Sequence, residues 1–152
     1  MSTVDAFDHK ILALLQENAR ITFTEIGRRV HLTSPAVAER IKRIEESGVV
    51  NGYATRINLR KFGYSFEAFI LITVKSHPAL DAWAAARDEV LALHATTGSH
   101  CAIIRLALTS AEHLQSLLSS LGAIGRTTTS MVLSSCFEDR KRVHGAKLAM
   151  LE

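Results

Sequence analysis

The sequence contains few of the residues that mark a disulfide-rich, metal-binding or membrane protein. It has only two cysteines, Cys101 and Cys136, and their spacing gives neither a disulfide framework nor a thiolate metal site. The longest nearly uninterrupted apolar run is the nine residues 66–74, whereas a membrane span requires roughly 20. No basic segment followed by an apolar stretch opens the chain, and we therefore expect a soluble, cytoplasmic protein.

Motifs for catalysis and cofactor binding are also missing. The seven histidines are scattered without metal-ligand spacing, and there is no glycine-rich phosphate loop and no Ser-x-x-Lys nucleophile motif. His100 and Cys101 are adjacent, but neighbouring residues on a strand point to opposite faces. A small buried residue at a strand start is therefore favoured over a metal or nucleophile site. We expect no enzymatic activity, no metal and no cofactor.

The positive charge is confined to the first part of the chain. Hydrophobic residues make up 47% of the sequence, which is enough for one mid-sized core or two small ones. Residues 1–63 carry ten Lys or Arg against seven Asp or Glu, and residues 64–152 carry eight against eight. The whole excess of +3 therefore lies in the first 63 residues. An anionic partner is attracted to such an excess, so these residues are the place to look for a nucleic-acid contact.

Apolar residues at helical spacing predict three helices in the first part of the chain, over residues 4–16, 23–30 and 34–47. Each begins at capping residues: Asp5 with Asp8, Thr22 with Glu25, and Thr33 with Ser34 and Pro35. Three residues join the second and third helices, which predicts a helix-turn-helix. An Asn-Gly turn signal with alternation over residues 49–57 predicts a short strand or wing, and residues 58–64 are predicted to form an ordered hinge.

The rest of the chain alternates between strand and helix patterns. The predicted strands cover residues 66–74, 91–97, 101–108 and 127–137, and the predicted helices cover 78–88 and the segment from a Thr109–Glu112 capping box to Gly122. The order βαββαβ is that of a ferredoxin-like α+β sandwich with helices on one sheet face, and we expect a homodimer through the uncovered face. The predicted organisation is a helix-turn-helix domain at residues 1–52, a strand and hinge linker at 53–64, and a ferredoxin-like domain at 65–152.

The outer flank of the third predicted helix is the strongest candidate site, because Val37, Ile41 and Ile44 share its inward face. Basic and hydroxyl residues of the second helix and the turn lie beside this flank. Together they give the candidate contacts to double-stranded DNA: Thr24, Arg28, Arg29, Thr33, Ser34, Pro35, Ala36, Glu39, Arg40, Lys42 and Arg43. Arg40 and Arg43 suit either guanine or phosphate, and the sequence does not distinguish the two. The alternative is the solvated face of an ordinary amphipathic helix.

The chain resembles the leucine-responsive regulator/AsnC (Lrp/AsnC, feast/famine) family of transcription factors from Asp5 to about Phe137. The most specific matches are the Leu-Thr-Ser-Pro entry to the third helix, the Arg40-x-x-Arg43-x-Glu45-x-x-Gly48 run and the Thr97-Gly98 pair. The resemblance implies a winged-type helix-turn-helix that binds DNA, followed by a dimerising, effector-sensing RAM-type domain. It also implies homodimers that assemble further into tetramers or octamers.

The resemblance places an effector-binding loop at Thr97, Gly98, Ser99, His100 and Cys101. The family commonly has aspartate where this chain has Cys101. A thiol is a poor partner for an ammonium group, which puts an amino-acid effector in doubt, although backbone groups around Thr97 to Ser99 can still hold a ligand carboxylate.

We therefore predict a sequence-specific, dimer-based transcriptional regulator. Three alternative functions remain open. The first is a weakly specific architectural protein that wraps DNA. The second is an enzyme resembling haem-pathway decarboxylases, with a porphyrin bound by His94 or His100. The third is a ligand-binding partner that modulates another regulator through mixed oligomers.

Overall fold

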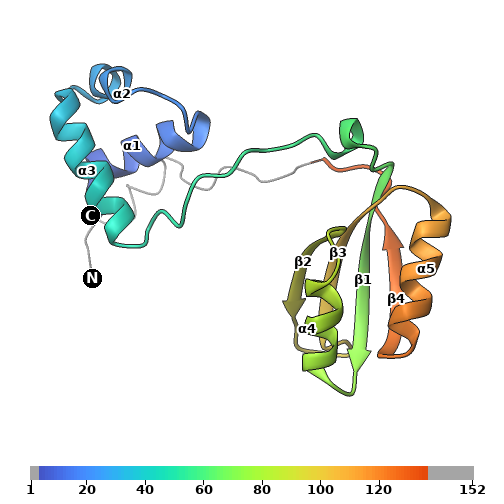
Figure 1. The fold of residues 1–152 in the computed structure, drawn as a ribbon. Coiled ribbons are helices and arrows are strands. Elements are labelled where there is room, and N and C mark those ends of the chain that lie inside the picture. Colours follow the sequence, from blue (N-terminus) through green and yellow to red (C-terminus); the bar gives the residue numbers. More distant parts are fainter. Residues whose placement is uncertain (1–3, 137–152) are drawn as a thin grey trace. The chain divides into compact units, whose positions relative to one another are not determined.

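The computed structural model describes residues 4–136 and divides the chain into two compact units, with the boundary between Thr55 and Arg56 (Figure 1). The helical unit, residues 4–55, contains α1 (Ala6–Glu17), α2 (Phe23–Val30) and α3 (Ser34–Glu46). The sheet unit, residues 56–136, contains a short 3₁₀ helix η1 (Leu59–Phe62), β1 (Phe66–Val74), α4 (His77–Ala85), β2 (Val90–Ala95), β3 (Ala102–Leu108), α5 (Ala111–Gly122) and β4 (Gly125–Met131). None of the described helices is long and apolar enough to cross a membrane.

The helical unit has the three predicted helices around a small apolar core. Its buried side chains come from all three helices and include Ile11, Ile26, Val30, Val37 and Ile41. The predicted caps form as well. Asp5 and Asp8 make a reciprocal capping box on α1, and the hydroxyls of Thr22 and Thr33 accept from backbone N–H groups at the starts of α2 and α3. The helix-turn-helix prediction is confirmed, and α2 has the predicted bounds.

The turn between α2 and α3 depends on one close backbone approach. His31 ends α2 in the left-handed conformation at φ 59°, so that the chain reverses before Thr33. The carbonyl of Leu32 then lies so close to Gly27 that a Cβ atom there would sit 2.4 Å from the oxygen. Only glycine fits at residue 27 without moving the turn.

The strand predicted over residues 49–57 is wrong. This segment has no regular secondary structure, and the next element is η1, which Asn58 caps. A strand needs a neighbour that pairs with its backbone groups. No strand of the described residues 4–136 pairs with this segment.

The sheet unit confirms the predicted βαββαβ order. Its four antiparallel strands lie in the order β2-β3-β1-β4, and α4 and α5 cover one face (Figure 1). Alternate residues of β1 and β3, including Ile70, Ile72, Ile104 and Leu106, are fully buried on that face. Leu80, Trp83, Leu117 and Leu121 pack on them from the two helices. The fold class is therefore α+β, as predicted.

Several boundaries in the sheet unit differ from the sequence prediction, most of them by one or two residues. α4 ends at Ala85 instead of residue 88. Ser110, and not Thr109, caps α5, because its hydroxyl accepts from the His113 N–H at 3.1 Å. β4 starts at Gly125, two residues early, and ends at Met131. Gly125 lets the strand lie against β1, since a Cβ there would be 2.3 Å from the Thr73 oxygen. The rest of the predicted domain, residues 137–152, lies outside the described residues.

We predict that Gly27→Ala destabilises the helical unit by about 1–3 kcal/mol, since the new methyl group displaces the Leu32 carbonyl. The matched control is Gly122→Ala at the end of α5, where no atom lies within 4 Å of the added Cβ. This control should be neutral or stabilise by up to about 1 kcal/mol. Urea unfolding followed by circular dichroism measures both. Equal stability of the two variants would show that the turn tolerates a side chain.

Candidate nucleic-acid interface and effector loop

The α3 helix has the two faces that its sequence predicts. Val37, Ile41 and Ile44 are buried, whereas Pro35, Glu39, Lys42 and Arg43 on the outer side are exposed. Ser34 and Ala36 are half-buried at the first turn, where the Thr33 hydroxyl accepts from the Ala36 N–H at 3.4 Å. The outer flank of the N-terminal half of α3 is therefore exposed on the helical unit. This is the part of a recognition helix that contacts base edges.

Two cations of α2 share one carboxylate. Glu25 accepts from Arg28 Nη2 at 2.8 Å and from Arg29 Nε at 2.7 Å, and the hydrogen bonds from Arg28 and then Arg29 lower the pKa of Glu25 to about 2. The Arg28 side chain is 72% exposed and that of Arg29 47%, and Thr24 is exposed in the same helix. The group carries one net positive charge on an open surface, which suits a phosphate contact.

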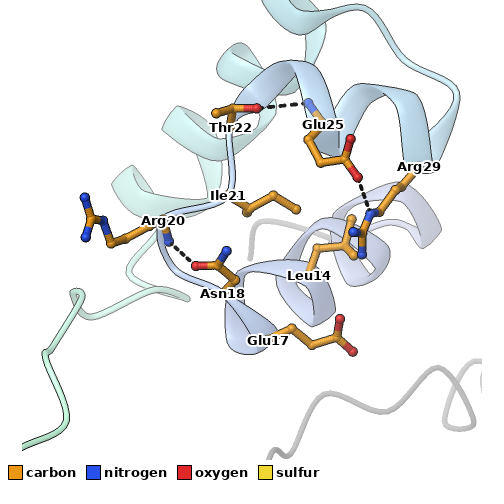
Figure 2. Close-up of a pocket in the computed structure, with 8 residues that line it drawn as sticks. All are labelled: Leu14, Glu17, Asn18, Arg20, Ile21, Thr22, Glu25 and Arg29. Carbon is orange, nitrogen blue, oxygen red and sulfur yellow. Dashed lines mark hydrogen bonds and ion pairs between the residues drawn. The ribbon is translucent and has the colours of Figure 1, made fainter.

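A hollow of about 420 Å³ lies where α1 ends and α2 begins (Figure 2). Glu25 and Arg29 form part of its wall, and Figure 2 shows Arg20 at its edge, just before the Thr22 cap. Within the described residues the Arg20 guanidinium has no hydrogen-bond or ion-pair partner. Arg20 is thus an additional candidate phosphate contact that the sequence reasoning missed. The signal was available in the sequence, because Arg20 lies two residues before the Thr22 cap, at the positive end of α2 where anions bind.

The two arginines of α3 bind to the start of α1. The carboxylate of Asp8, which is only 1% exposed, accepts from Arg40 Nη1 at 2.8 Å and from Arg43 Nη2 at 2.7 Å. Asp5 accepts a second hydrogen bond from Arg40 at 2.6 Å. The sequence-based prediction makes Arg40 and Arg43 two equivalent members of one DNA-contacting flank. The structure brings both to a buried carboxylate that the sequence analysis used only as a helix cap.

Arg40 is the more enclosed of the two arginines. Its side chain is 24% exposed, against 50% for Arg43, and its guanidinium lies 5.3 Å from the ring centre of Phe7. The hydrogen bonds to Asp5 and Asp8 raise the pKa of Arg40. Burial acts to raise the pKa of Asp5, but the hydrogen bond from Arg40 and two backbone N–H groups outweigh it and the pKa falls. Arg40 therefore anchors α3 to α1.

The candidate effector loop is the tight connection between β2 and β3. Gly98 has φ +107°, and the Thr96 hydroxyl and N–H donate to the His100 and Cys101 carbonyls at 2.9 Å each. Ser99 Oγ and His100 Nδ1 lie 3.1 Å apart. Thr97, Gly98 and Ser99 are exposed, while His100 and Cys101 are half-buried. The structure therefore leaves the backbone of residues 97–99 accessible to a ligand.

The Cys101 thiol makes two hydrogen bonds to the backbone of β1. The sulfur accepts from the Val74 N–H and donates to the Ile72 carbonyl, both at 3.3 Å. These bonds extend the pairing of β3 with β1 by one residue. The thiol thus occupies backbone groups of β1 and is not directed at solvent as a free nucleophile. Among the described residues no group of three His, Cys, Asp or Glu side chains is placed to hold a metal ion.

The sheet face opposite α4 and α5 carries apolar side chains around one ion pair. Phe69 on β1 is 38% exposed, and Leu71 pairs with Ile103 across the β1–β3 register. Glu67 and Arg105 form an ion pair of 2.7 Å beside them. No helix of the sheet unit covers this face (Figure 1). It is an apolar surface with a charged pair and has the composition of a subunit contact.

We predict that Arg40→Met lowers the free energy of unfolding by about 2 kcal/mol at neutral pH, because Asp5 and the buried Asp8 lose a cationic partner. The folded pKa of Asp5 is lowered, so its contribution to stability is present above pH about 4 and is lost as the pH falls through the folded pKa. The variant should lose less stability than the wild type between pH 5 and pH 2. Chemical unfolding at several pH values measures this, and parallel pH curves would contradict the anchoring role.

Comparison with known proteins gives the same two parts in the same order. The model of the AsnC-type helix-turn-helix domain matches residues 4–45, and the model of the Lrp/AsnC ligand-binding domain matches residues 67–142. The chain is 36% identical to the HTH-type transcriptional regulator LrpB of Bacillus subtilis over 78% of this chain and 80% of that protein. It is 34% identical to the HTH-type transcriptional regulator Rv2324 of Mycobacterium tuberculosis over 91% and 97% of the two chains.

A solved structure supports the same assignment. The feast or famine regulatory protein Rv3291c of M. tuberculosis, complexed with L-methionine, superposes with a TM-score of 0.81 at 29% identity. The superposition covers 93% of this chain and all of that one. The three-helix unit, the helix-covered sheet and the two matching domain models therefore agree, and the chain belongs to the Lrp/AsnC family of transcriptional regulators.

Proposed function

We propose that this regulator binds a roughly palindromic DNA site as a homodimer, with one α3 helix from each subunit in successive major grooves. The observation that carries the proposal is the exposed outer flank of α3. The helix begins at a hydroxyl cap, and its opposite, apolar face is buried. Residues 1–52 would contact DNA, residues 53–64 would connect the domains, and residues 65–152 would dimerise and bind an effector. Since the partner is chromosomal DNA, we expect the protein to act in the cytoplasm.

The candidate DNA contacts fall into two classes. Residues at the start of α3 lie where side chains meet base edges, namely Ser34, Pro35, Ala36 and Glu39. Lys42 and the α2 pair of Arg28 and Arg29 are exposed cations that suit phosphates, with the hydroxyls of Thr24 and Thr33 beside them. Phosphate contacts would position the protein, and the contacts from the start of α3 would supply sequence preference.

The uncovered sheet face is the proposed dimer contact. A face that carries Phe69, Leu71 and Ile103 gains from apolar burial against a second copy of itself. Assembly of dimers into tetramers or octamers follows from the family resemblance.

A small-molecule effector is proposed for the loop of residues 97–101. The matched domain model is that of a ligand-binding domain, and the similar M. tuberculosis protein was solved with L-methionine. In this chain the Cys101 thiol is engaged with the β1 backbone, so it offers no charge to an ammonium group. Backbone N–H groups of Thr97, Gly98 and Ser99 suit a carboxylate. An amino acid or another small carboxylate is therefore the proposed effector class.

We propose no enzymatic activity, because the matched relatives are transcriptional regulators. The effector would act by favouring one oligomer over another, which requires that it bind one assembly more tightly.

We predict that the protein binds the DNA upstream of its own gene more tightly than a scrambled duplex of equal composition. Two to four phosphates neutralised per subunit give a dimer affinity that falls with roughly the fourth to seventh power of salt concentration. Fluorescence anisotropy titrations at several salt concentrations measure both quantities, with a panel of amino acids added in parallel. Equal affinity for the scrambled duplex, with long protected tracts in footprinting, would instead identify a weakly specific wrapping protein. No binding to either duplex would refute the proposal.

We predict that Phe69→Glu weakens dimerisation at least tenfold, because each copy would bring a charge into the apolar face. The matched control is Ser116→Glu, which adds the same charge to an exposed position of α5 away from this face. Analytical ultracentrifugation measures the association constant, and circular dichroism checks the fold. If Phe69→Glu remains as dimeric as the control, the subunits associate through another surface.

A further inference from the structure

Arg40 and Arg43 lie one turn apart on α3 but differ in their exposure and in the number of carboxylates that they bind. Arg40 donates to two carboxylates, packs on Phe7 and is mostly covered. Arg43 donates from Nη2 to Asp8 at 2.7 Å and is half exposed. Among the described residues no other partner of the Arg43 guanidinium is found. Its Nη1 group and the second N–H of Nη2 are therefore available as a forked pair of donors.

The charges around Arg43 distinguish between the two kinds of DNA acceptor. Asp5, Asp8, Arg40 and Arg43 together carry no net charge. A phosphate that approached Arg43 would also approach the Asp8 carboxylate on the same guanidinium and would be repelled by it. The O6 and N7 atoms of guanine are uncharged acceptors, so they accept from the free donors without this penalty.

Asp8 also limits the directions that the Arg43 side chain can take. The carboxylate is 1% exposed and is itself held by Arg40 and by the Asp5 N–H at 3.1 Å. A buried, fixed acceptor orients the guanidinium before DNA is bound. A long side chain that is already ordered loses less conformational entropy on binding.

We propose that Arg43 recognises a guanine edge in the major groove while Asp8 fixes its direction, and that Arg40 is a positioning residue that does not touch DNA. This inference rests on the proposed DNA-binding function and assigns different roles to the two arginines. It adds Asp8, a buried residue of α1, to the residues that determine specificity.

The first test selects bound duplexes from a randomised DNA library with the wild type and with Arg43→Lys, a variant that keeps the charge. Affinities are then measured for the selected site and for each of its single-base substitutions. The wild type should prefer guanine roughly ten- to a hundredfold at one position of each half-site. Arg43→Lys should lose most of this preference with little change in salt dependence, because lysine lacks the planar fork.

Lys42→Ala is the matched contrast on the same helix. The Lys42 side chain is 68% exposed, and its Nζ lies 3.9 Å from Glu46 Oε1, which is a loose ion pair. We expect Lys42 to contact phosphate. This variant should bind all sequences more weakly, reduce the salt exponent by about one and keep the guanine preference.

Asp8→Asn is the second variant, because it leaves Arg43 charged but removes the fixed carboxylate. It should bind random DNA more tightly and with a steeper salt dependence, and it should lose guanine preference. Circular dichroism checks its fold, and if it does not fold, the Arg43→Lys comparison alone decides the matter.

The outcomes separate this inference from the proposed function. If the wild type enriches no sequence, the proposed function fails. If the wild type selects a site and Arg43→Lys keeps its guanine preference, Arg43 does not recognise guanine and only the inference fails. An adenine, cytosine or thymine preference lost in Arg43→Lys would overturn the guanine assignment in the same way.

Discussion

The buried carboxylate of Asp8 is the interaction on which the geometry of the helical unit depends. It closes the capping box of α1 and accepts from two arginines one turn apart on α3. Apolar packing of Ile11 against Val37 and Ile41 brings the helices together, but such packing is not directional. Charged hydrogen bonds of 2.7–2.8 Å have a defined direction, so they fix how α3 is turned and which flank it presents.

In the sheet unit, side-chain hydrogen bonds likewise fix the candidate effector loop of residues 97–101. The Cys101 thiol and the Thr73 hydroxyl bond to backbone groups on the neighbouring segment, so that the loop is tied to the end of β1. A side chain engaged in this way cannot also act as the acid that holds a ligand. A ligand bound at this candidate loop would therefore depend more on the exposed backbone of residues 97–99.

Local signals in the sequence were sufficient for most of the fold. The caps at Asp5, Thr22 and Thr33 lie within three residues of the groups that they satisfy, and these helices were predicted closely. Strand β1 was predicted at its observed bounds. The strand over residues 49–57 was not, because strand formation depends on a pairing partner that local alternation does not supply. The roles of Arg40 and Arg43 also stayed hidden, since Asp8 lies 32 and 35 residues away in the chain.

The formal charge of +3 in residues 1–63 gives a poor measure of what DNA would encounter. Arg28 and Arg29 share Glu25, and Arg40 and Arg43 are balanced by Asp5 and Asp8. Among the described residues of the helical unit, the cations with no ion-pair partner or a loose one include Arg20, between α1 and α2, and Lys42 on α3. A surface with so few uncompensated charges gives modest affinity from phosphates alone. Tight binding then requires two copies of the surface and base contacts from α3, and Arg40 contributes by fixing the orientation of that helix.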